Sequence, residues 1–383
     1  MIRFLALAQG IALAVLLVRL LPGRRRRPPV APRPAASSAD GDVSVVVAAL
    51  DEAHRIQPCL DGLTAQGTVV REILVVDSGS TDGTQDLVRA AAARDPRIAL
   101  LRDPPLPSGW VGKVWALEHG LAQARGEWVL GVDADTAPQP GCVGGALAAA
   151  REHSYDAVSF APRFRIDSAG ERWLQPALLV TLVYRFGAAG VDADPERVLA
   201  NGQCFLARRA VLEAIGGYAV ARTSFADDVT LARALARAGH RVGFLDGSRL
   251  YDVRAYTSAR EVWREWGRSL DLKDATTRAR QWADVVFLLV VQGTPLPALV
   301  VLLLRALERA SLGGDALALL ATSSALVGMR LLVQFALAPS YAERGAPFWL
   351  APLADPLAAL RILLSTLRRP TRWRGRDYGS LQA

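Results

Sequence analysis

Cysteine and histidine are scarce in this sequence, and neither forms a cluster. The 383 residues include three cysteines and four histidines. Their spacing matches neither a zinc site nor a redox-active dithiol, and isolated cysteines are typical of a reducing compartment. We therefore assign no chemistry to the histidines and expect the cysteines to be small buried apolar residues. These residues are Cys59, Cys142, Cys204, His54, His119, His153 and His240.

The order of charge and hydrophobicity at the N-terminus is opposite to that of a cleaved signal peptide, which has its basic residues before the apolar stretch. Residues 2–21 are apolar and about long enough to cross a bilayer. Four arginines follow them, from Arg24 to Arg27. Basic flanks of this kind stay on the cytoplasmic side. We expect a transmembrane anchor and, after it, a stiff Pro-rich linker.

The sequence is basic, but it does not favour a nucleic-acid partner. The formal net charge is +8 and the isoelectric point is near 9.9. The arginines gather beside apolar runs, where cytoplasmic flanks of membrane segments carry them. Apolar residues make up 51% of the chain and the mean hydropathy is +0.20, which is high for a wholly soluble protein. The composition therefore predicts a membrane protein.

The C-terminal third contains three apolar blocks, at about residues 285–304, 316–338 and 348–367. Three crossings would leave the basic tail outside, against the positive-inside rule. The first block contains one glycine and two prolines, so we predict that it is re-entrant or interfacial and that the other two form a hairpin. Inside these blocks, Arg330 and Asp355 are predicted to form an ion pair.

Between the membrane segments, apolar runs of strand length alternate with helical patterns. Val43–Ala49, Ile73–Val76 and Trp128–Val132 have the short apolar character of buried parallel strands. The alternation predicts an α/β domain with a mainly parallel sheet. In such sheets ligands bind at the carboxyl ends of the strands. The intervening helices are expected at Ile56–Gln66, Gly83–Arg94 and Val114–Arg125.

Acidic residues follow each of these strands, and a further acidic pair lies near the end of the domain. Carboxylates at strand ends suit hydrogen bonds to a ribose or base, or ligation of a hard cation. A single aspartate there is as readily a helix cap or a turn residue, but four groups together favour a site. The residues are Asp51, Glu52, Asp77, Asp133, Asp135, Asp227 and Asp228.

The motifs that carry these residues resemble the family-2 inverting glycosyltransferases with the GT-A fold. In order they read VSVVVAALDEAHRI, ILVVDSGSTDGT, GEWVLGVDADT, NGQCFLARRAVLEAIGGY and FADDVTLARAL, over about residues 43–250. The segment LPSGWVGKVWAL is similar to one in hopanoid-associated and carotenoid glycosyltransferases. The terminal WRGRDY, residues 373–378, is similar to the endings of membrane members that act on lipids.

The resemblance implies a role for each matched residue. Glu52 and Asp77 would contact the nucleotide, and Lys113 would reach the donor's phosphates, for which a compact ammonium is suited. Asp228 would be the general base, with Asp227 where the family usually has Glu. The remaining residues are Ala49 and Leu50 for the base pocket, Asp133 and Asp135 for Mg²⁺ or Mn²⁺ and the diphosphate, and Asn201, Gly202 and Gln203 for the acceptor side.

The predicted function is inverting transfer from a nucleotide sugar, UDP-hexose by preference, to a lipid hydroxyl. An isoprenoid-derived acceptor such as a hopanoid or carotenoid is favoured, at the inner membrane, in a multi-pass protein with a cytoplasmic catalytic domain. A polyprenyl-phosphate or polysaccharide transferase and a non-catalytic membrane scaffold remain alternatives. The predicted boundaries are an anchor at 1–22, a linker at 23–42, the GT-A domain at 43–255, interfacial amphipathic helices at 256–283, a membrane region at 284–368 and a basic cytoplasmic tail at 369–383.

Overall fold

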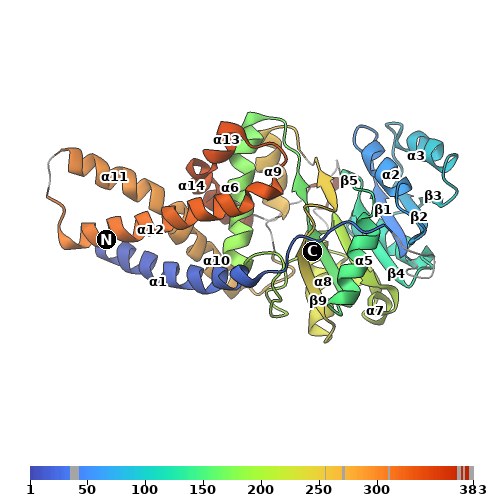
Figure 1. Ribbon diagram of the computed structural model, residues 1–383, viewed down its shortest axis with the longest axis horizontal. Coiled ribbons are helices and arrows are strands. Elements are labelled where there is room, and N and C mark those ends of the chain that lie inside the picture. Colours follow the sequence, from blue (N-terminus) through green and yellow to red (C-terminus); the bar gives the residue numbers. More distant parts are fainter. Residues whose placement is uncertain are drawn as a thin grey trace. The chain divides into compact units, whose positions relative to one another are not determined.

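A computed structural model describes residues 1–34, 43–254, 256–269, 272–308, 311–368, 372–373 and 376–378. The chain divides into two compact units, each built from separate stretches (Figure 1). We call them the helical unit and the sheet unit. The helical unit comprises Met1–Arg26, Ile166–Ala188 and Tyr256–Pro370, and the sheet unit comprises Arg27–Arg165, Ala189–Ala255 and Thr371–Ala383.

The sheet unit is built on a seven-stranded sheet of order β3-β2-β1-β4-β8-β6-β9. The first four strands along the chain are parallel, and only β8 runs antiparallel to its neighbours β4 and β6. The predicted α/β class with a mainly parallel sheet is confirmed. The strands are β1 (Val43–Ala49), β2 (Val70–Asp77), β3 (Ile98–Arg102), β4 (Trp128–Asp133), β6 (Ala157–Ala161), β8 (Cys204–Arg208) and β9 (Val242–Asp246).

Helices cover both faces of this sheet, which explains why β1 is apolar at almost every position. Val45 and Val47 point to a core shared with α2, α3 and α5, whereas Val46 points to a second core shared with α4, α7 and α8. The three cysteines are buried and free, as predicted. The helices are α2 (Ile56–Thr64), α3 (Thr84–Ala92), α4 (Gly112–Gln123), α5 (Cys142–Glu152), α7 (Arg209–Ala214), the 3₁₀ turn η2 (Gly217–Ala221) and α8 (Asp227–Arg237).

A small second sheet completes the unit, with the order β5-β10-β7. It pairs β5 (Thr136–Pro138), directly after the predicted metal motif, with β10 (Tyr251–Val253), and β10 with β7 (Arg163–Phe164). The pairing therefore joins the chain after β4 to the last strand of the domain.

The first part of the predicted linker docks onto the sheet unit. The backbone N–H of Val30 donates to the carbonyl of Asp246 (2.8 Å), and that of Arg33 donates to the carbonyl of Gly141 (2.9 Å). A Cβ at Gly141 would lie 2.9 Å from the backbone of Arg33, so a glycine permits this close approach. The Val30 side chain packs against the core of the sheet. Residues 27–34 are thus part of the domain surface rather than a free spacer.

The helical unit contains the segments predicted to meet the membrane. Within it α1 packs along α12, and α12 packs against α11 (Figure 1). Its elements are α1 (Ile2–Leu20), η1 (Leu21–Arg25), α6 (Ala169–Phe186), α9 (Ala259–Ser269), α10 (Arg278–Leu288), the π turn η3 (Leu289–Gly293), α11 (Pro295–Leu307), α12 (Gly314–Leu337), η4 (Ala338–Ser340), α13 (Gly345–Trp349), η5 (Ala351–Ala354) and α14 (Asp355–Leu367).

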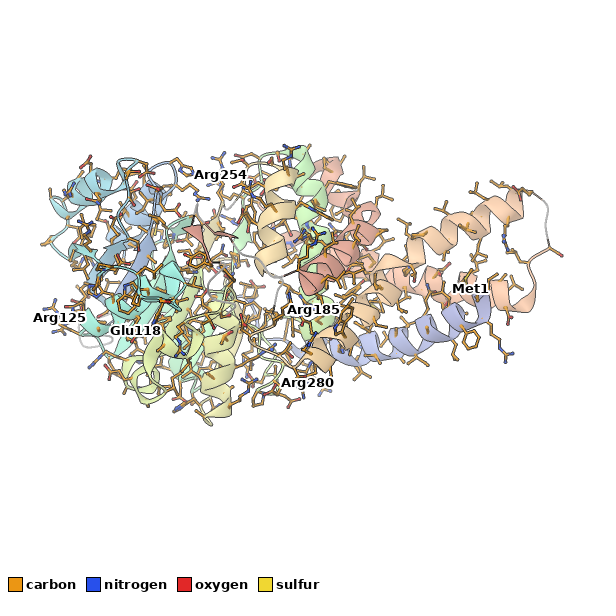
Figure 2. All side chains as sticks on the ribbon, turned by 180° about the vertical axis from the view of Figure 1, so that it is seen from behind. Met1, Glu118, Arg125, Arg185, Arg254 and Arg280 are labelled. Atoms are coloured by element: carbon orange, nitrogen blue, oxygen red, sulfur yellow. The ribbon has the colours of Figure 1, made fainter. Side chains whose placement is uncertain are left out.

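Among the described residues, three helical stretches are long and apolar enough to cross a membrane: Ile2–Arg25, Arg278–Leu307 and Gly314–Ser340. Large apolar side chains on them, including Phe4, Leu303 and Leu332, are exposed. Figure 2 shows side chains projecting outward from the helices around Met1. The N-terminal prediction is consistent with this assignment.

Two of the C-terminal blocks are subdivided in the structure. The first block was predicted to be re-entrant or interfacial because of its glycine and prolines. A π turn, η3, ends at Gly293 and α11 begins at Pro295, while the stretch Arg278–Leu307 as a whole is long and apolar enough to cross a membrane. The re-entrant or interfacial placement stays a prediction. The third block, predicted to be half of a hairpin, is divided into α13, η5 and α14, each with a proline near its start. At 13 residues α14 alone is too short to span.

The helical unit contains the predicted ion pair and one helix that was predicted to belong to the GT-A domain. The predicted ion pair is confirmed, since Arg330 Nε lies 2.8 Å from Asp355 Oδ2 and both side chains are buried. In contrast, α6 lies within the span assigned to the GT-A domain but packs in the helical unit, against α9 and α14. Its buried apolar residues Leu174 and Leu178 share a core with these helices. The predicted boundaries themselves stay a prediction.

Candidate active site

The register of three neighbouring strands brings the predicted acidic residues to one edge of the sheet. In the β1–β2 pair, Ala49 lies opposite Asp77, and in the β1–β4 pair, Ala48 lies opposite Asp133. All three strands are parallel, so their carboxyl ends meet at this edge, where ligands bind in such sheets. Ala49, Asp77 and Asp133, predicted from separate motifs, are therefore neighbours in space.

The loops after β1 and β2 are tied together by short hydrogen bonds. The backbone N–H of Thr81 donates to Asp51 Oδ1 (2.8 Å), and that of Glu52 donates to Thr84 Oγ1 (2.8 Å). Asp51 adopts a left-handed backbone with φ of 53°. Aspartate tolerates this conformation better than most residues because its side chain bonds locally. Asp51 is thus a turn residue, and its effect is to hold the two loops in register.

Asp77 is buried at the end of β2, and one of its carboxylate oxygens lacks a hydrogen-bond partner among the described residues. Its Oδ2 accepts hydrogen bonds from the backbone N–H groups of Gly79 (3.0 Å) and Ser80 (3.1 Å) and from Gln85 Nε2 (2.7 Å). Its Oδ1 has no hydrogen-bond partner among the described residues. A buried acceptor without a partner is costly, so this oxygen suits a donor group of a bound nucleotide. Glu52 differs, because its carboxylate receives Arg55 Nε at 3.0 Å.

Lys113, at the start of α4, connects the β4 end to the acidic pair of α8. Its Nζ lies 2.7 Å from Asp133 Oδ1. On the other side, the backbone N–H of Gly202 donates to Asp228 Oδ2 at 2.7 Å. A Cβ at Gly202 would lie 3.1 Å from Lys113 Nζ, so the absence of a side chain there makes room for the lysine. Three segments distant in sequence thus converge on one point.

The charges in this cluster perturb one another strongly. Burial by itself lowers the pKa of Lys113, but the carboxylates of Asp133, Asp227 and Asp228 outweigh this effect and hold the pKa above its ordinary value. Burial, reinforced by the neighbouring Asp227, raises the pKa of Asp228 to about 7, although Lys113 opposes the rise. A carboxylate with a pKa near neutrality has the basicity that a general base needs.

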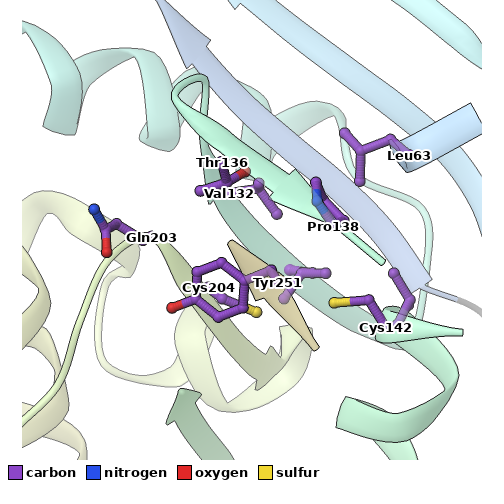
Figure 3. Close-up of a pocket in the computed structure, with 10 residues that line it drawn as sticks. Leu63, Val132, Thr136, Pro138, Cys142, Gln203, Cys204 and Tyr251 are labelled. Atoms are coloured by element: carbon purple, nitrogen blue, oxygen red, sulfur yellow. The ribbon is translucent and has the colours of Figure 1, made fainter. Parts of the chain in front are cut away.

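The predicted acceptor residues lie beside Asp228 but are bonded mainly to each other. Asn201 Nδ2 donates to Gln203 Oε1 (2.9 Å), and the backbone N–H of Gln203 donates to Asn201 Oδ1 (3.1 Å). Only Gly202 contacts Asp228 directly. Gln203 also borders a small cavity with Cys204 and Tyr251 (Figure 3). Its lining is otherwise almost entirely apolar, so this cavity belongs to the core beneath the site.

Oxygen ligands for a hard cation are present at the β4 end. Among the described residues, no three Asp, Glu, His or Cys side chains are gathered as a metal cluster. Mg²⁺ is commonly held by one or two carboxylates together with substrate phosphates and water. Asp133 and Asp135 match that arrangement, since they flank β4's end and Lys113 beside them suits a phosphate. The residues fit Mg²⁺ or Mn²⁺ that shares its ligands with a diphosphate.

The structure adds one residue to this region that the sequence analysis noted only as the end of a terminal motif. Tyr378 is buried, and its Oη accepts a hydrogen bond from the backbone N–H of Gly112 (3.2 Å), next to Lys113. A contact across 266 positions leaves no local pattern, and the only signal in the sequence was an aromatic residue in a charged tail.

Comparison with known proteins agrees with this geometry. Residues 44–216 match the family model described as Glycosyl transferase family 2. These residues, a little under half of the chain, are therefore similar to a family 2 glycosyltransferase domain. A specific similarity to hopanoid or carotenoid enzymes stays a prediction.

Two relatives and one solved structure show what else this chain is similar to. Succinoglycan biosynthesis protein ExoA of Rhizobium meliloti (strain 1021) is 28% identical over 55% of this chain and 63% of its own length. Undecaprenyl-phosphate 4-deoxy-4-formamido-L-arabinose transferase of Pseudomonas fluorescens is 31% identical over 37% of this chain and 40% of its own. The chain thus spans less than two thirds of either relative. Mannosyltransferase PcManGT from Pyrobaculum calidifontis, solved with GDP-Man and Mn²⁺, is 21% identical, with a TM-score of 0.55 over 93% of this chain and 99% of that one. This likeness shows a shared GT-A fold.

Proposed function

We propose that this protein transfers a sugar from a nucleotide sugar to the hydroxyl group of a membrane lipid, with inversion at the anomeric carbon. The observation that carries the proposal is the convergence of Lys113, Asp133 and Asp228 at the carboxyl edge of the sheet. The cluster combines Asp228, a base of suitable pKa, with Lys113, a cation placed where it could contact phosphates. Sugar transfer requires both a base for the acceptor hydroxyl and positive charge for the leaving group.

The reaction is a single displacement. Asp228 accepts the proton of the acceptor hydroxyl while that oxygen forms its bond to the anomeric carbon. The bond from this carbon to the nucleoside diphosphate breaks, and the diphosphate leaves with the electron pair. Lys113 stabilises the departing charge. Mg²⁺ or Mn²⁺ held by Asp133 and Asp135 would further neutralise the diphosphate. One displacement inverts the configuration.

The donor is assigned to the β1–β2 side of the cluster. The free Oδ1 of Asp77 supports a contact to the base or ribose of the nucleotide, next to a base pocket at Ala49. Glu52 would act from the same loop, held by Arg55. We favour UDP-hexose as the donor. Asn201, Gly202 and Gln203 would face the acceptor, and Asp227 would support Asp228 electrostatically.

Membrane lipid is proposed as the acceptor class because three helices are apolar enough to span a bilayer. Arg24–Arg27 after the first of them supports a cytoplasmic catalytic domain at the inner membrane. An isoprenoid-derived acceptor such as a hopanoid or carotenoid rests on the resemblance of residues 106–117. Asp228 favours a hydroxyl over a polyprenyl phosphate, because a phosphate is already largely ionised at pH 7 and needs no base.

The test uses detergent-solubilised protein, a panel of UDP- and GDP-sugars and a total lipid extract of the source. Release of nucleoside diphosphate is followed with Mn²⁺ or Mg²⁺ and with EDTA, and the lipids are searched for a mass gain of one hexose. Metal-dependent release together with a new glycolipid supports the proposal and identifies both substrates. A product on lipid phosphate would favour the polyprenyl alternative. No turnover and no metal-dependent nucleotide binding would favour a non-catalytic scaffold.

A further inference from the structure

Tyr378 belongs to the tail of the chain, yet its side chain is buried in the sheet unit at 6% exposure. Ten residues separate it from the end of α14. Before it, the backbone of the tail folds back on itself, with Arg372 opposite Asp377 and Trp373 opposite Arg376 in an antiparallel pair. Tail residues are usually poorly ordered unless they are held in place, so a buried tyrosine here needs an explanation.

The first contact of Tyr378 completes the start of α4. The N-cap position of this helix is Val111, which makes no side-chain capping bond. Valine is among the poorest N-cap residues, and the first N–H groups of a helix lack intrahelical partners. The backbone N–H of Gly112 donates instead to Tyr378 Oη at 3.2 Å. The tail therefore supplies the cap that the local sequence does not provide.

The second contact of Tyr378 lies on the other side of the cluster. Its ring meets Phe225 edge to face, with centroids 5.5 Å apart and an interplanar angle of 85°. Phe225 comes three residues before Asp228, and Gly112 comes directly before Lys113. One side chain thus contacts the two segments that carry the lysine and the acidic pair.

A backbone hydrogen bond also joins these segments near the helix start. The backbone N–H of Val111 donates to the carbonyl of Arg222 at 2.7 Å. Upstream of it, Gly109 has a φ of 81°, and no atom lies within 4 Å of its Cβ position. Removal of Tyr378 would leave this bond and the shared apolar core of Val111 and Ala221 to hold the start of α4 against the segment before the acidic pair.

We propose that Tyr378 is a positioning residue, through which the C-terminal tail fixes Lys113 relative to Asp228. The proposal rests on the function proposed above. It assigns the tail an indirect part in sugar transfer: contact with Gly112 sets the start of α4, and contact with Phe225 sets the segment that leads to the base. The tail follows α14, the last apolar helix, so the contacts of Tyr378 form only after that helix has been synthesised.

The first measurement tests the contact without requiring any activity. Hydrogen–deuterium exchange is followed in peptides that cover residues 109–117 of the full-length protein. Tyr378→Phe keeps the ring and removes the hydroxyl, and Tyr378→Ala removes both contacts. Faster exchange of these peptides is expected in both variants. Tyr155→Phe is the matched control, because it removes a buried hydroxyl bond to Asp192 elsewhere in the sheet unit.

The second measurement tests the positioning role, with kcat and KM determined separately for donor and acceptor. Loss of one hydrogen bond predicts a fall of about twofold to tenfold in kcat for Tyr378→Phe. Displacement of the lysine predicts a larger fall, about tenfold to a hundredfold, for Tyr378→Ala. The acceptor KM is expected to stay within about twofold, and Tyr155→Phe to behave as wild type.

The outcomes separate this proposal from the proposed function. Unchanged exchange at 109–117 in both variants overturns the contact, and faster exchange with unchanged kcat overturns the positioning role. The positioning role is also overturned if kcat falls equally in Tyr155→Phe and the fall matches the loss of folded protein. If the wild type transfers no sugar, the proposed function fails first. Binding of UDP with Mn²⁺ then replaces kcat, and equal affinity in wild type and Tyr378→Ala contradicts the role of Tyr378.

Discussion

Buried charge is arranged differently in the two units of this protein. In the helical unit, Arg330 donates to both carboxylate oxygens of Asp355, at 2.8 and 3.0 Å. Gln334 and Gln292 extend this pair, by contacts of 2.6 Å to Arg330 and 3.2 Å to Asp355. The arrangement is balanced, with one charge of each sign and neutral amides around them.

In the sheet unit, by contrast, like charges are gathered. The carboxylates of Asp133, Asp227 and Asp228 all act on the single ammonium of Lys113. Such an arrangement is unfavourable for folding by itself, and it is typical of sites that bind ions or perform proton transfer. The comparison separates two uses of buried charge: a balanced pair connects helices, whereas an unbalanced cluster at a sheet edge indicates chemistry.

The comparison is tested most strongly by breaking the balanced pair. Arg330→Met leaves Asp355 buried without its partner, so the free energy of unfolding should fall by about 3–5 kcal/mol. Thermal unfolding in detergent measures this. The double variant Arg330→Met/Asp355→Leu removes both charges and should recover most of the loss. Sugar transfer per folded molecule should stay unchanged in both. Full folding with loss of kcat would instead place this pair in the catalytic machinery.

Breaking the unbalanced cluster should have the opposite consequence. Lys113→Met removes the cation proposed to face the donor phosphates, and kcat should fall by about 10²–10³, as for loss of one electrostatic contact in a transition state. The thermal midpoint should fall less than in Arg330→Met, because Asp133, the partner left behind, is 27% exposed whereas Asp355 is 6% exposed. Lys273→Met is the matched control, since it alters the chain's only other lysine, which donates to the carbonyl of Ser365 in the helical unit. Equal losses in both variants would contradict the role of Lys113.

The pH dependence sharpens the assignment of the base. Asp228 must be deprotonated to accept a proton, and its pKa is raised to about 7. Below that pH the protonated fraction grows, so kcat/KM should fall about tenfold per pH unit and should level off above it. The measurement is a pH–rate profile between pH 5 and 9 at saturating metal, with the folded fraction checked at each pH. A flat profile down to pH 5 would mean that the base has an ordinary carboxylate pKa.

The parts of this account that the sequence predicts are those with a local pattern. Val43–Ala49 was predicted as a strand and is β1, because a continuous apolar run of that length has few other uses in an α/β chain. The acidic residues at strand ends were identified because they follow these apolar runs directly in the sequence. Parallel pairing then brings Asp77 and Asp133 to one edge without further information.

The parts that the sequence could not predict depend on contacts between distant segments. Periodicity carries no signal for the approach of Lys113 to Asp228, for the docking of Val30 on β9, or for the cap that Tyr378 provides. The membrane segments are a different case. The glycine and prolines of the first block predicted a break, and the structure has a π turn that ends at Gly293 before α11 begins at Pro295.

The central claim is that the cluster at the sheet edge is a catalytic site in which Asp228 removes the acceptor's proton. The most direct test compares single-turnover sugar transfer by the wild type and Asp228→Asn, together with UDP binding in the presence of Mn²⁺. We predict that transfer falls by about 10²–10⁴, while nucleotide affinity stays within about threefold. Transfer by Asp228→Asn at the wild-type rate would show that another group takes the proton and would contradict the account.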